Sequence, residues 1–220
     1  MQAEVYVFDA YGTLFDVHSA VARYYAAIGP TIAGRFSEIW RSKQLEYSWV
    51  RSLCGAYADF STLTAQALDF AAAIHGGISP ALRDRLLDAY KDLDIYFDAA
   101  KTIPALHKKG ARLAILSNGT EAMLQEALAA SGLARFFETV LSVDEIGVFK
   151  TDPRAYALVE THMGVTPDRV SFQSSNRWDI AGAVRFGFRT IWINRAKMPD
   201  EYPDLAPAAE VSSLMGLLDL

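Results

Sequence analysis

The segment VYVFDAYGTLFD, residues 5–16, begins as a short apolar run and then places a carboxylate before a glycine turn. Val5–Phe8 is too short for a helix and apolar on both faces, which is typical of a strand buried in a parallel sheet. Asp9 follows at the carboxyl end of this strand, where open α/β sheets bind ligands. The segment predicts a fixed, partly desolvated carboxylate that could attack carbon or phosphorus, or alternatively an aspartate that only caps a turn.

The rest of the chain repeats this strand pattern with helical stretches in between. Four further apolar runs are expected to be strands: Leu113–Leu116, Thr139–Val143, Val170–Phe172 and Thr190–Ile193. Helical periodicity fills gaps between them at Glu121–Ala130, Arg154–His162 and Trp178–Phe186. This alternation of strands and helices predicts an α/β fold with a doubly wound parallel sheet.

One long interval lacks a convincing strand, and we interpret it as an inserted helical cap over residues 17–96. Its helical segments are Ala20–Ile28, Phe36–Leu53, Thr64–Ile74 and Leu82–Leu93. Residues 1–16 and 97–220 then form the core domain. A cap that enters after the first strand would cover the carboxyl ends of the strands, so we expect the functional site between core and cap.

Composition argues against several classes of partner. The formal net charge is -5 and the basic residues form no stripe, so nucleic acid is not expected as a partner. The N-terminus has no basic region and no apolar run could span a bilayer, so we expect a cytoplasmic protein without a membrane partner. Cys54 is the only cysteine, which fits a reducing compartment. The four histidines are scattered without metal-ligand spacing.

Four more segments carry side chains suited to chemistry. They read LSNGT at residues 116–120, VFKTDP at 148–153, FQSSNRWD at 172–179 and, in the expected cap, WRSKQLEY at 40–47. In LSNGT, backbone amides, a hydroxyl and the Asn118 carboxamide would lie at a helix N-terminus, where such groups form an anion site. An ordinary helix cap would also explain Ser117 or Thr120. Arg41 and Leu45 are four positions apart, so on a helix they share one face.

Together these segments resemble the motifs of the haloacid dehalogenase superfamily, over essentially the whole chain. The resemblance implies the Rossmann-like core of that superfamily with an inserted cap. Its phosphatases place a second aspartate two residues after the nucleophile as a general acid, and this chain has Tyr11 there. A phenol, with a pKa of about 10, is a poor acid for that role, whereas a departing halide needs no proton. The substitution favours carbon–halogen cleavage over phosphoryl transfer.

The resemblance also implies a role for each matched residue. The catalytic set would be the nucleophile Asp9, the charge-balancing Lys150, the residues Ser174, Asn176 and Asp179 that orient the lysine and the hydrolytic water, and also Thr13 and Tyr156. Arg41 and Asn118 would receive the halide. The substrate would lie against Ala10, Tyr11, Ser117, Leu45, Phe60 and Trp178, of which the first three hold its carboxylate and the last three form an apolar pocket.

Segment 172–179 also bears on metal binding, because phosphatases of the superfamily hold Mg²⁺ with paired aspartates at this strand end. Magnesium prefers carboxylate oxygens, and here the first acidic position is filled by Ser or Asn. Neither a metal nor another cofactor is therefore expected. Three positions depart from the family pattern: Thr151 replaces a proline, and Gln173 and Arg177 replace small or apolar residues.

The implied reaction is hydrolysis of short (S)-2-haloalkanoic acids to (R)-2-hydroxyalkanoic acids through an Asp9 ester, with inversion at C2. Such a hydrolase acts on a carbon–halide bond and binds a small 2-haloacid and a halide ion. Homodimers are common in the family and are expected here. Three alternatives stay open: a phosphatase of the same fold, a hydrolase that opens a ring such as azetidine-2-carboxylate, and a noncatalytic binding protein.

Overall fold

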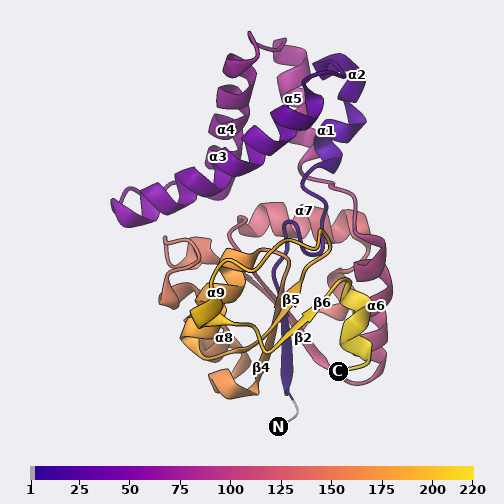
Figure 1. Cartoon of the computed structure of the whole chain (residues 1–220), viewed down its shortest axis with the longest axis vertical. Helices are drawn as coiled ribbons and strands as arrows, with labels where there is room; N and C mark the ends of the chain where they lie inside the picture. The colour runs from indigo at the N-terminus through magenta and orange to yellow at the C-terminus, as the bar shows by residue number, and fades with distance from the viewer. Residues whose placement is uncertain (1–2) are drawn as a thin grey trace.

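The centre of the molecule is a sheet of parallel strands, seen in a computed structural model that describes residues 3–220 (Figure 1). Within these residues the sheet has six strands in the order β3-β2-β1-β4-β5-β6. Their bounds are β1 Val5–Phe8, β2 Arg112–Ser117, β3 Thr139–Ser142, β4 Val170–Ser174, β5 Arg189–Ile193 and β6 Ala209–Val211. Every neighbouring pair is parallel. The predicted parallel sheet is confirmed, with β1 at its centre between β2 and β4.

Helices cover both faces of this sheet. They are α6 Phe97–Lys108, α7 Glu121–Ser131, α8 Pro153–Met163 and α9 Arg177–Phe186. Val5 and Val7 are buried together with side chains of α8 and α9, whereas Phe8 is buried together with side chains of α6 and α7. Successive residues of a strand point to opposite faces. β1 therefore needs apolar residues on both faces, which is why its sequence shows no alternation.

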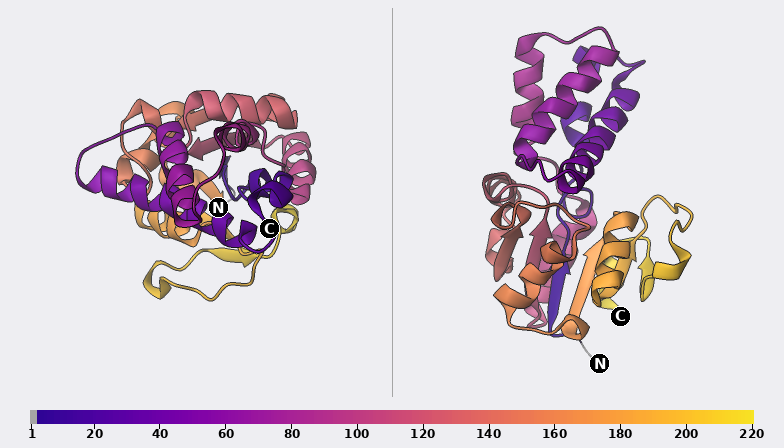
Figure 2. Two further views of the ribbon diagram at one scale, coloured as in Figure 1. Left: turned by 90° about the horizontal axis from the view of Figure 1, so that it is seen from above. Right: turned by 90° about the vertical axis from the view of Figure 1, so that its left-hand side faces the viewer.

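The described residues between β1 and α6 form a layer of helices that stands apart from the sheet, beyond the carboxyl ends of the strands (Figures 1 and 2). They are α1 Ser19–Arg23, α2 Tyr25–Ile28, α3 Ala33–Leu53, α4 Phe60–Ile74 and α5 Pro80–Ala89. The long helices α3 and α4 pack against each other. The carboxyl-terminal part of α3 reaches the core, where the ring centroid of Trp49 lies 5.6 Å from that of Trp178.

The bounds of these helices follow from local signals at their ends. The expected helix Ala20–Ile28 is two helices, because Tyr24 leaves the helical region with φ -114° and ψ 21°. α4 begins at Phe60, four residues earlier than expected, since the Asp59 carboxylate accepts a hydrogen bond from the amide of Thr62. The hydroxyl of Ser79 caps the start of α5 in the same way.

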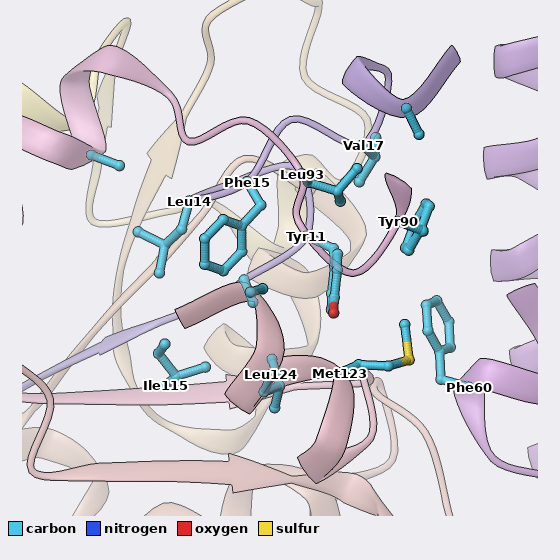
Figure 3. Close-up of a cluster of buried hydrophobic side chains, with 14 of the residues drawn as sticks. Tyr11, Leu14, Phe15, Val17, Phe60, Tyr90, Leu93, Ile115, Met123 and Leu124 are labelled. Carbon is cyan, nitrogen blue, oxygen red and sulfur yellow. The ribbon is translucent and has the colours of Figure 1, made fainter. Parts of the chain in front are cut away.

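A cluster of buried apolar side chains joins the helical layer to the core (Figure 3). Its centre is Tyr11, whose ring stacks on Tyr90 at 5.7 Å between centroids and lies 6.2 Å from Phe60. Tyr11 also presses against Gly119, where an added Cβ would lie 2.5 Å from the Tyr11 ring. The turn after β1 is thus held from both sides, by the helical layer and by the loop after β2.

Two elements of the core are absent from the sequence-based expectation. β6 has only three residues at the edge of the sheet, which is too short to establish a period. α6 contains Pro104, a residue that disfavours the interior of a helix. Among residues 3–220, no helix combines the length and the apolar character that a membrane crossing requires.

Candidate active site

The carboxylate of Asp9 is the meeting point of four side chains. Its Oδ2 accepts hydrogen bonds from the Thr13 hydroxyl at 2.9 Å, the Asn176 amide at 2.8 Å and the Ser174 hydroxyl at 3.4 Å. Its Oδ1 accepts from the Lys150 ammonium at 3.2 Å. Asp9 is 5% exposed, so these contacts replace most of its water.

This convergence follows from the register of β1 and β4. Phe8 is paired with Gln173, and the amide of Asp9 donates to the Gln173 carbonyl at 2.9 Å. Asp9 and Ser174 therefore leave adjacent strands at the same level. The turn after Asp9 needs Gly12, whose φ of +92° is unfavourable for other residues. This turn lets the Thr13 hydroxyl face back toward the Asp9 carboxylate.

Lys150 forms a buried ion-pair cluster with two carboxylates. Its ammonium lies 2.9 Å from Asp179 Oδ2 and 3.2 Å from Asp9 Oδ1, and its side chain is fully buried. Burial acts to lower the pKa of Lys150, but the two carboxylates outweigh it and hold that pKa above its usual value. Lys150 therefore stays charged.

Asp179 is fixed from its other side by Tyr156, whose hydroxyl donates to Asp179 Oδ1 at 2.9 Å. Burial, together with the charge of Asp9, raises the pKa of Asp179 to about 6, although Lys150 acts in the opposite direction. Two carboxylates share one ammonium here, so the second negative charge is the less favourable one. Gly182 leaves room for the Tyr156 side chain, because a Cβ at position 182 would collide with the Tyr156 hydroxyl.

Arg41 and Asn118 each present a buried nitrogen that has no hydrogen-bond partner within the described residues. Arg41 uses Nη2 to donate to the Tyr11 carbonyl at 3.3 Å and leaves Nη1 unpaired. Asn118 accepts the amide of Lys150 through Oδ1 at 3.0 Å, which turns its unpaired Nδ2 outward from that contact. The buried Tyr11 hydroxyl is also unpaired. Buried donors are normally satisfied, so these groups are suited to an anion.

The three residues of the expected apolar pocket differ in burial. Phe60 is buried against Tyr11, as described above, and Leu45 is half-buried on α3. Trp178 is half-buried and borders a cavity of about 820 Å³ that Lys150 and Trp49 also line. Trp178 borders a second cavity of about 350 Å³ as well, together with Gly12 and Asn176. Trp178 thus lines one cavity with Lys150 and another with Asn176, two residues that contact Asp9.

Two of the expected substrate-binding residues make only local contacts. The Ser117 hydroxyl accepts from the amide of Gly119 at 3.1 Å and keeps its own proton for another acceptor. Ala10 is buried at the start of the nucleophile turn, and its carbonyl accepts from the amide of Leu14 at 2.8 Å. Both residues lie at the carboxyl ends of central strands: Ala10 is the second residue after β1, and Ser117 is the last residue of β2.

Among the described residues, the side chains at the three departures from the family pattern make no hydrogen bond to the Asp9 carboxylate. Gln173 points to the opposite face of β4 from Ser174, and its amide donates to Ser171. Arg177 turns away to Asp200 at 2.6 Å and to carbonyls of the segment 202–205. Thr151 packs on α9, where a Cβ at Gly182 would lie 3.0 Å from its side chain.

Sequence reasoning missed a second arginine close to the site. Arg195 follows β5 and donates to the carbonyls of Gly12 and Thr13, while Asp98 on α6 holds it from behind. Its position just after a strand on the ligand-binding edge was the one available signal. Tyr57 was also missed; it is hydrogen-bonded to Asp144 and ties the loop before α4 to the core.

Among residues 3–220, no group of three or more His, Cys, Asp or Glu side chains is arranged so that it could hold a metal ion. The positive charge between Asp9 and Asp179 is supplied by the Lys150 ammonium. The arrangement therefore combines a desolvated carboxylate, a buried cation beside it and unpaired donors nearby. It can deliver a carboxylate oxygen to an electrophile and receive an anion.

This geometry defines a hydrolase with an aspartate nucleophile, and comparison with known proteins identifies its family. The model of the haloacid dehalogenase-like hydrolases matches residues 3–187. The chain belongs to this family.

The most informative relatives are dehalogenases. The (S)-2-haloacid dehalogenase 4A of Burkholderia cepacia is 48% identical over 215 residues, which cover 97% of this chain and 93% of that protein. The (S)-2-haloacid dehalogenase 1 of Pseudomonas sp. (strain CBS-3) is also 48% identical, with 97% and 94% covered. The structure of L-2-haloacid dehalogenase from Xanthobacter autotrophicus with chloropropionic acid covalently bound has a TM-score of 0.88 and 37% identity, covering 100% of this chain and 98% of that one.

Proposed function

We propose that this protein hydrolyses short (S)-2-haloalkanoic acids to (R)-2-hydroxyalkanoic acids. The observation that carries the proposal is the Asp9 carboxylate, which is buried and, among residues 3–220, accepts from three donors at Oδ2 and from Lys150 at Oδ1. The names of the relatives support the substrate class, and the covalently bound chloropropionic acid in the Xanthobacter structure supports an ester intermediate. The division into a core of residues 1–16 and 97–220 and a cap of residues 17–96 belongs to the same proposal.

In the first step an oxygen of Asp9 attacks C2 in line with the departing halide, so the carbon inverts. The carbon–halogen bond breaks with its electron pair, and the halide leaves without a proton. Arg41 and Asn118 receive it through their unpaired nitrogens, which is supported by the absence of any other partner for those two atoms among the described residues. A donor placed for charge that develops in the transition state can contribute roughly 3–4 kcal/mol.

In the second step water attacks the carboxyl carbon of the ester, and the bond from that carbon to the ester oxygen on C2 breaks. The 2-hydroxyacid leaves with one proton of the water, the other proton is released to solvent, and Asp9 is regenerated with one solvent oxygen. Asn176 and Asp179 hold this water in our proposal, with Ser174 and Lys150 beside them. Asn176 supports this role because it contacts Asp9 at 2.8 Å and also lines the cavity of about 350 Å³. Leu45, Phe60 and Trp178 contact the alkyl group, and Ala10, Tyr11 and Ser117 hold the substrate carboxylate.

Metal removal and substrate handedness test this function directly. Purified protein in EDTA is expected to release halide from (S)-2-chloropropionate at the same rate as without EDTA, because Lys150 supplies the local cation. The (R)-isomer is expected to give no halide, since in-line attack fixes which face of C2 meets Asp9. Ion chromatography of chloride measures both. Turnover of a phosphate ester with added Mg²⁺, or of azetidine-2-carboxylate, in place of (S)-2-chloropropionate would contradict the proposal.

The acid side of the pH profile is expected to follow Asp179, whose pKa is raised to about 6. As pH falls through this value Asp179 binds a proton, so Lys150 keeps only Asp9 as a charged partner and draws the nucleophile more tightly. We expect kcat to fall below about pH 6. Steady-state chloride release between pH 4.5 and pH 8 measures this limb, and Asp179→Asn should lack it at a lower plateau rate.

Protonation of Asp179 is expected to lower kcat but to stabilise the folded protein. These opposite effects separate the loss of activity from unfolding. The pKa of Asp179 in the folded protein is above its usual value of 3.8, so between these values the folded state holds more protons than the unfolded state. Stability from this group therefore decreases as pH rises from 3.8 to about 6 and is constant above. The kcat loss should be fully reversible on return to pH 7.

Assembly as a homodimer and a cytoplasmic location stay predictions.

A further inference from the structure

We propose that Arg195 is a positioning residue that fixes the turn after the nucleophile and thereby aims the Thr13 hydroxyl at Asp9. The inference rests on the proposed function, in which Asp9 attacks and Arg195 itself touches no reacting atom. It assigns a task to a cluster outside the catalytic set, formed by the buried Asp98 and the half-buried Arg195 and Ser175.

Arg195 is bonded directly to the nucleophile turn. Its Nη2 donates to the Thr13 carbonyl at 2.9 Å, and its Nη1 donates to the Gly12 carbonyl at 3.3 Å. Nη1 also donates to the Ser175 hydroxyl at 2.5 Å. One guanidinium thus joins the turn after β1, which supplies Thr13, to the end of β4 and the loop after it, which supply Ser174 and Asn176 as donors to Asp9.

The hydrogen bonds around Thr13 fix the direction of its hydroxyl proton. The Thr13 oxygen accepts from the amide of Ser175 at 2.8 Å, and it lies 2.9 Å from Asp9 Oδ2. Because the Ser175 amide can only donate and an ionised carboxylate can only accept, the Thr13 hydroxyl proton points to Asp9. Arg195 binds both segments that form these hydrogen bonds, through the Thr13 carbonyl and the Ser175 side chain. A shift of either segment would turn the hydroxyl away from Asp9.

Asp98 makes the guanidinium rigid. Arg195 binds it through two parallel hydrogen bonds, Nε to Oδ2 at 3.1 Å and Nη2 to Oδ1 at 3.0 Å. Asp98 Oδ2 also accepts from the Leu214 amide at 2.9 Å. Burial acts to raise the pKa of Asp98, but Arg195 and the Leu214 amide outweigh it, so the net pKa is lowered and the carboxylate stays charged. The Tyr96 ring stacks on the guanidinium at 4.2 Å.

Only an arginine can make these contacts at once. The planar fork offers five N–H groups, whereas the ammonium of a lysine offers three on one flexible stem. Arg195→Lys keeps the charge beside Asp98 but cannot span the two carbonyls, the Ser175 hydroxyl and the carboxylate. The proposal therefore concerns the geometry that the guanidinium imposes, and the charge alone is not sufficient.

The first measurement is chloride release from (S)-2-chloropropionate by Arg195→Lys. We expect kcat to fall by up to about 10²-fold, the cost of misplacing a reacting group by about 1 Å, while KM changes little. The matched control is Arg112→Lys, because Arg112 also binds a carboxylate through two nitrogens, Glu138 at 2.7 Å and 2.9 Å, but lies at the amino end of β2. Equal losses in both variants would overturn the proposal.

A double-mutant cycle with Thr13→Val decides whether Arg195 acts through the Thr13 hydroxyl. If it does, adding Arg195→Lys to Thr13→Val should change kcat by less than about threefold. If the losses in kcat of the two single variants multiply in the double variant, even to a rate too low to measure, Arg195 acts by another route and the proposal is overturned.

A crystal structure of Arg195→Lys gives a readout that does not depend on the reaction. We expect the Thr13 hydroxyl to leave Asp9 Oδ2, and an unchanged hydrogen bond would contradict the proposal. Wild-type protein that releases no chloride would contradict the proposed function alone, since the position of Thr13 in this crystal structure would still test the role of Arg195.

Discussion

Asp9→Asn is expected to reduce halide release by a factor on the order of 10⁴ or more, the scale on which enzymes with covalent intermediates lose rate when the nucleophile is removed. A carboxamide has the shape of the carboxylate but no negative charge, so it cannot form the ester at C2. It also leaves the Lys150 ammonium, 3.2 Å away, without one of its two anionic partners. Chloride release from (S)-2-chloropropionate in EDTA measures the loss.

Asp16→Asn is the matched control for this substitution. Asp16 lies in the segment after β1, seven residues after Asp9, and its carboxylate accepts from the His18 amide at 2.9 Å and from the Tyr96 hydroxyl at 3.4 Å, neither of which contacts Asp9. Its removal should change the rate by less than about twofold, the usual range for a residue outside the reacting groups. Activity of Asp9→Asn within about tenfold of wild type would exclude Asp9 as the nucleophile.

Mass spectrometry of the intact protein adds an independent measurement on the same reaction. Rapid quenching of the wild type during turnover should trap a fraction with the mass of the acid attached, because the proposed ester persists until water attacks it. Turnover in ¹⁸O-labelled water should leave label in the peptide that contains Asp9. Label that enters only the product would contradict attack of water on the carboxyl carbon of the ester.

Lys150→Met is expected to have the second-largest effect, on both activity and stability. Methionine keeps the length and packing of the side chain but removes the charge between Asp9 and Asp179. Breaking a buried ion pair by removing one partner costs about 3–5 kcal/mol of the free energy of unfolding. We expect kcat to fall by about 10²–10³-fold, as when one preorganised electrostatic group is lost. Urea unfolding and chloride release measure the two effects.

The stability loss should be partly recovered in a double variant, Lys150→Met with Asp179→Asn. The second substitution removes the carboxylate that the first leaves without a cation, while Tyr156 can still donate to the carboxamide oxygen. Activity should not return, because Asp9 still lacks its cation. A double variant less stable than Lys150→Met alone would contradict this account of the ion-pair cluster. Lys109→Met, at an exposed lysine, serves as the control for the substitution type.

Much of the fold could be predicted from local patterns in the sequence. Val5–Phe8 is apolar on both faces because helices cover both faces of the sheet, and this pattern is visible without any partner strand. Helix ends were less predictable, since α4 and α5 begin where Asp59 and Ser79 provide caps just before the apolar periodicity. The edge strand β6 escaped prediction because three residues cannot establish a period.

The catalytic carboxylate could also be located from sequence, for a physical reason. An aspartate directly after a buried central strand must lie at the carboxyl edge of the sheet, whatever the rest of the chain does. The Tyr11 substitution pointed in the same way to a halide leaving group, whereas the expectation of no metal, drawn from Ser174, stays a prediction. These inferences depend on one residue and its immediate neighbours.

Only the tertiary structure decided which side chains meet Asp9 and how. Lys150 is 141 residues from Asp9 and 29 from Asp179, and Arg195 is 182 residues from Thr13. No local pattern encodes such contacts, because they arise from the order of strands in the sheet and from the packing of helices on it. The sequence by itself determined that a carboxylate stands at the ligand-binding edge. The packed fold determined that Oδ2 is held by three donors, that Lys150 is shared between two carboxylates and that a distant arginine clamps the nucleophile turn, since each requires strand ends far apart in the chain to lie side by side.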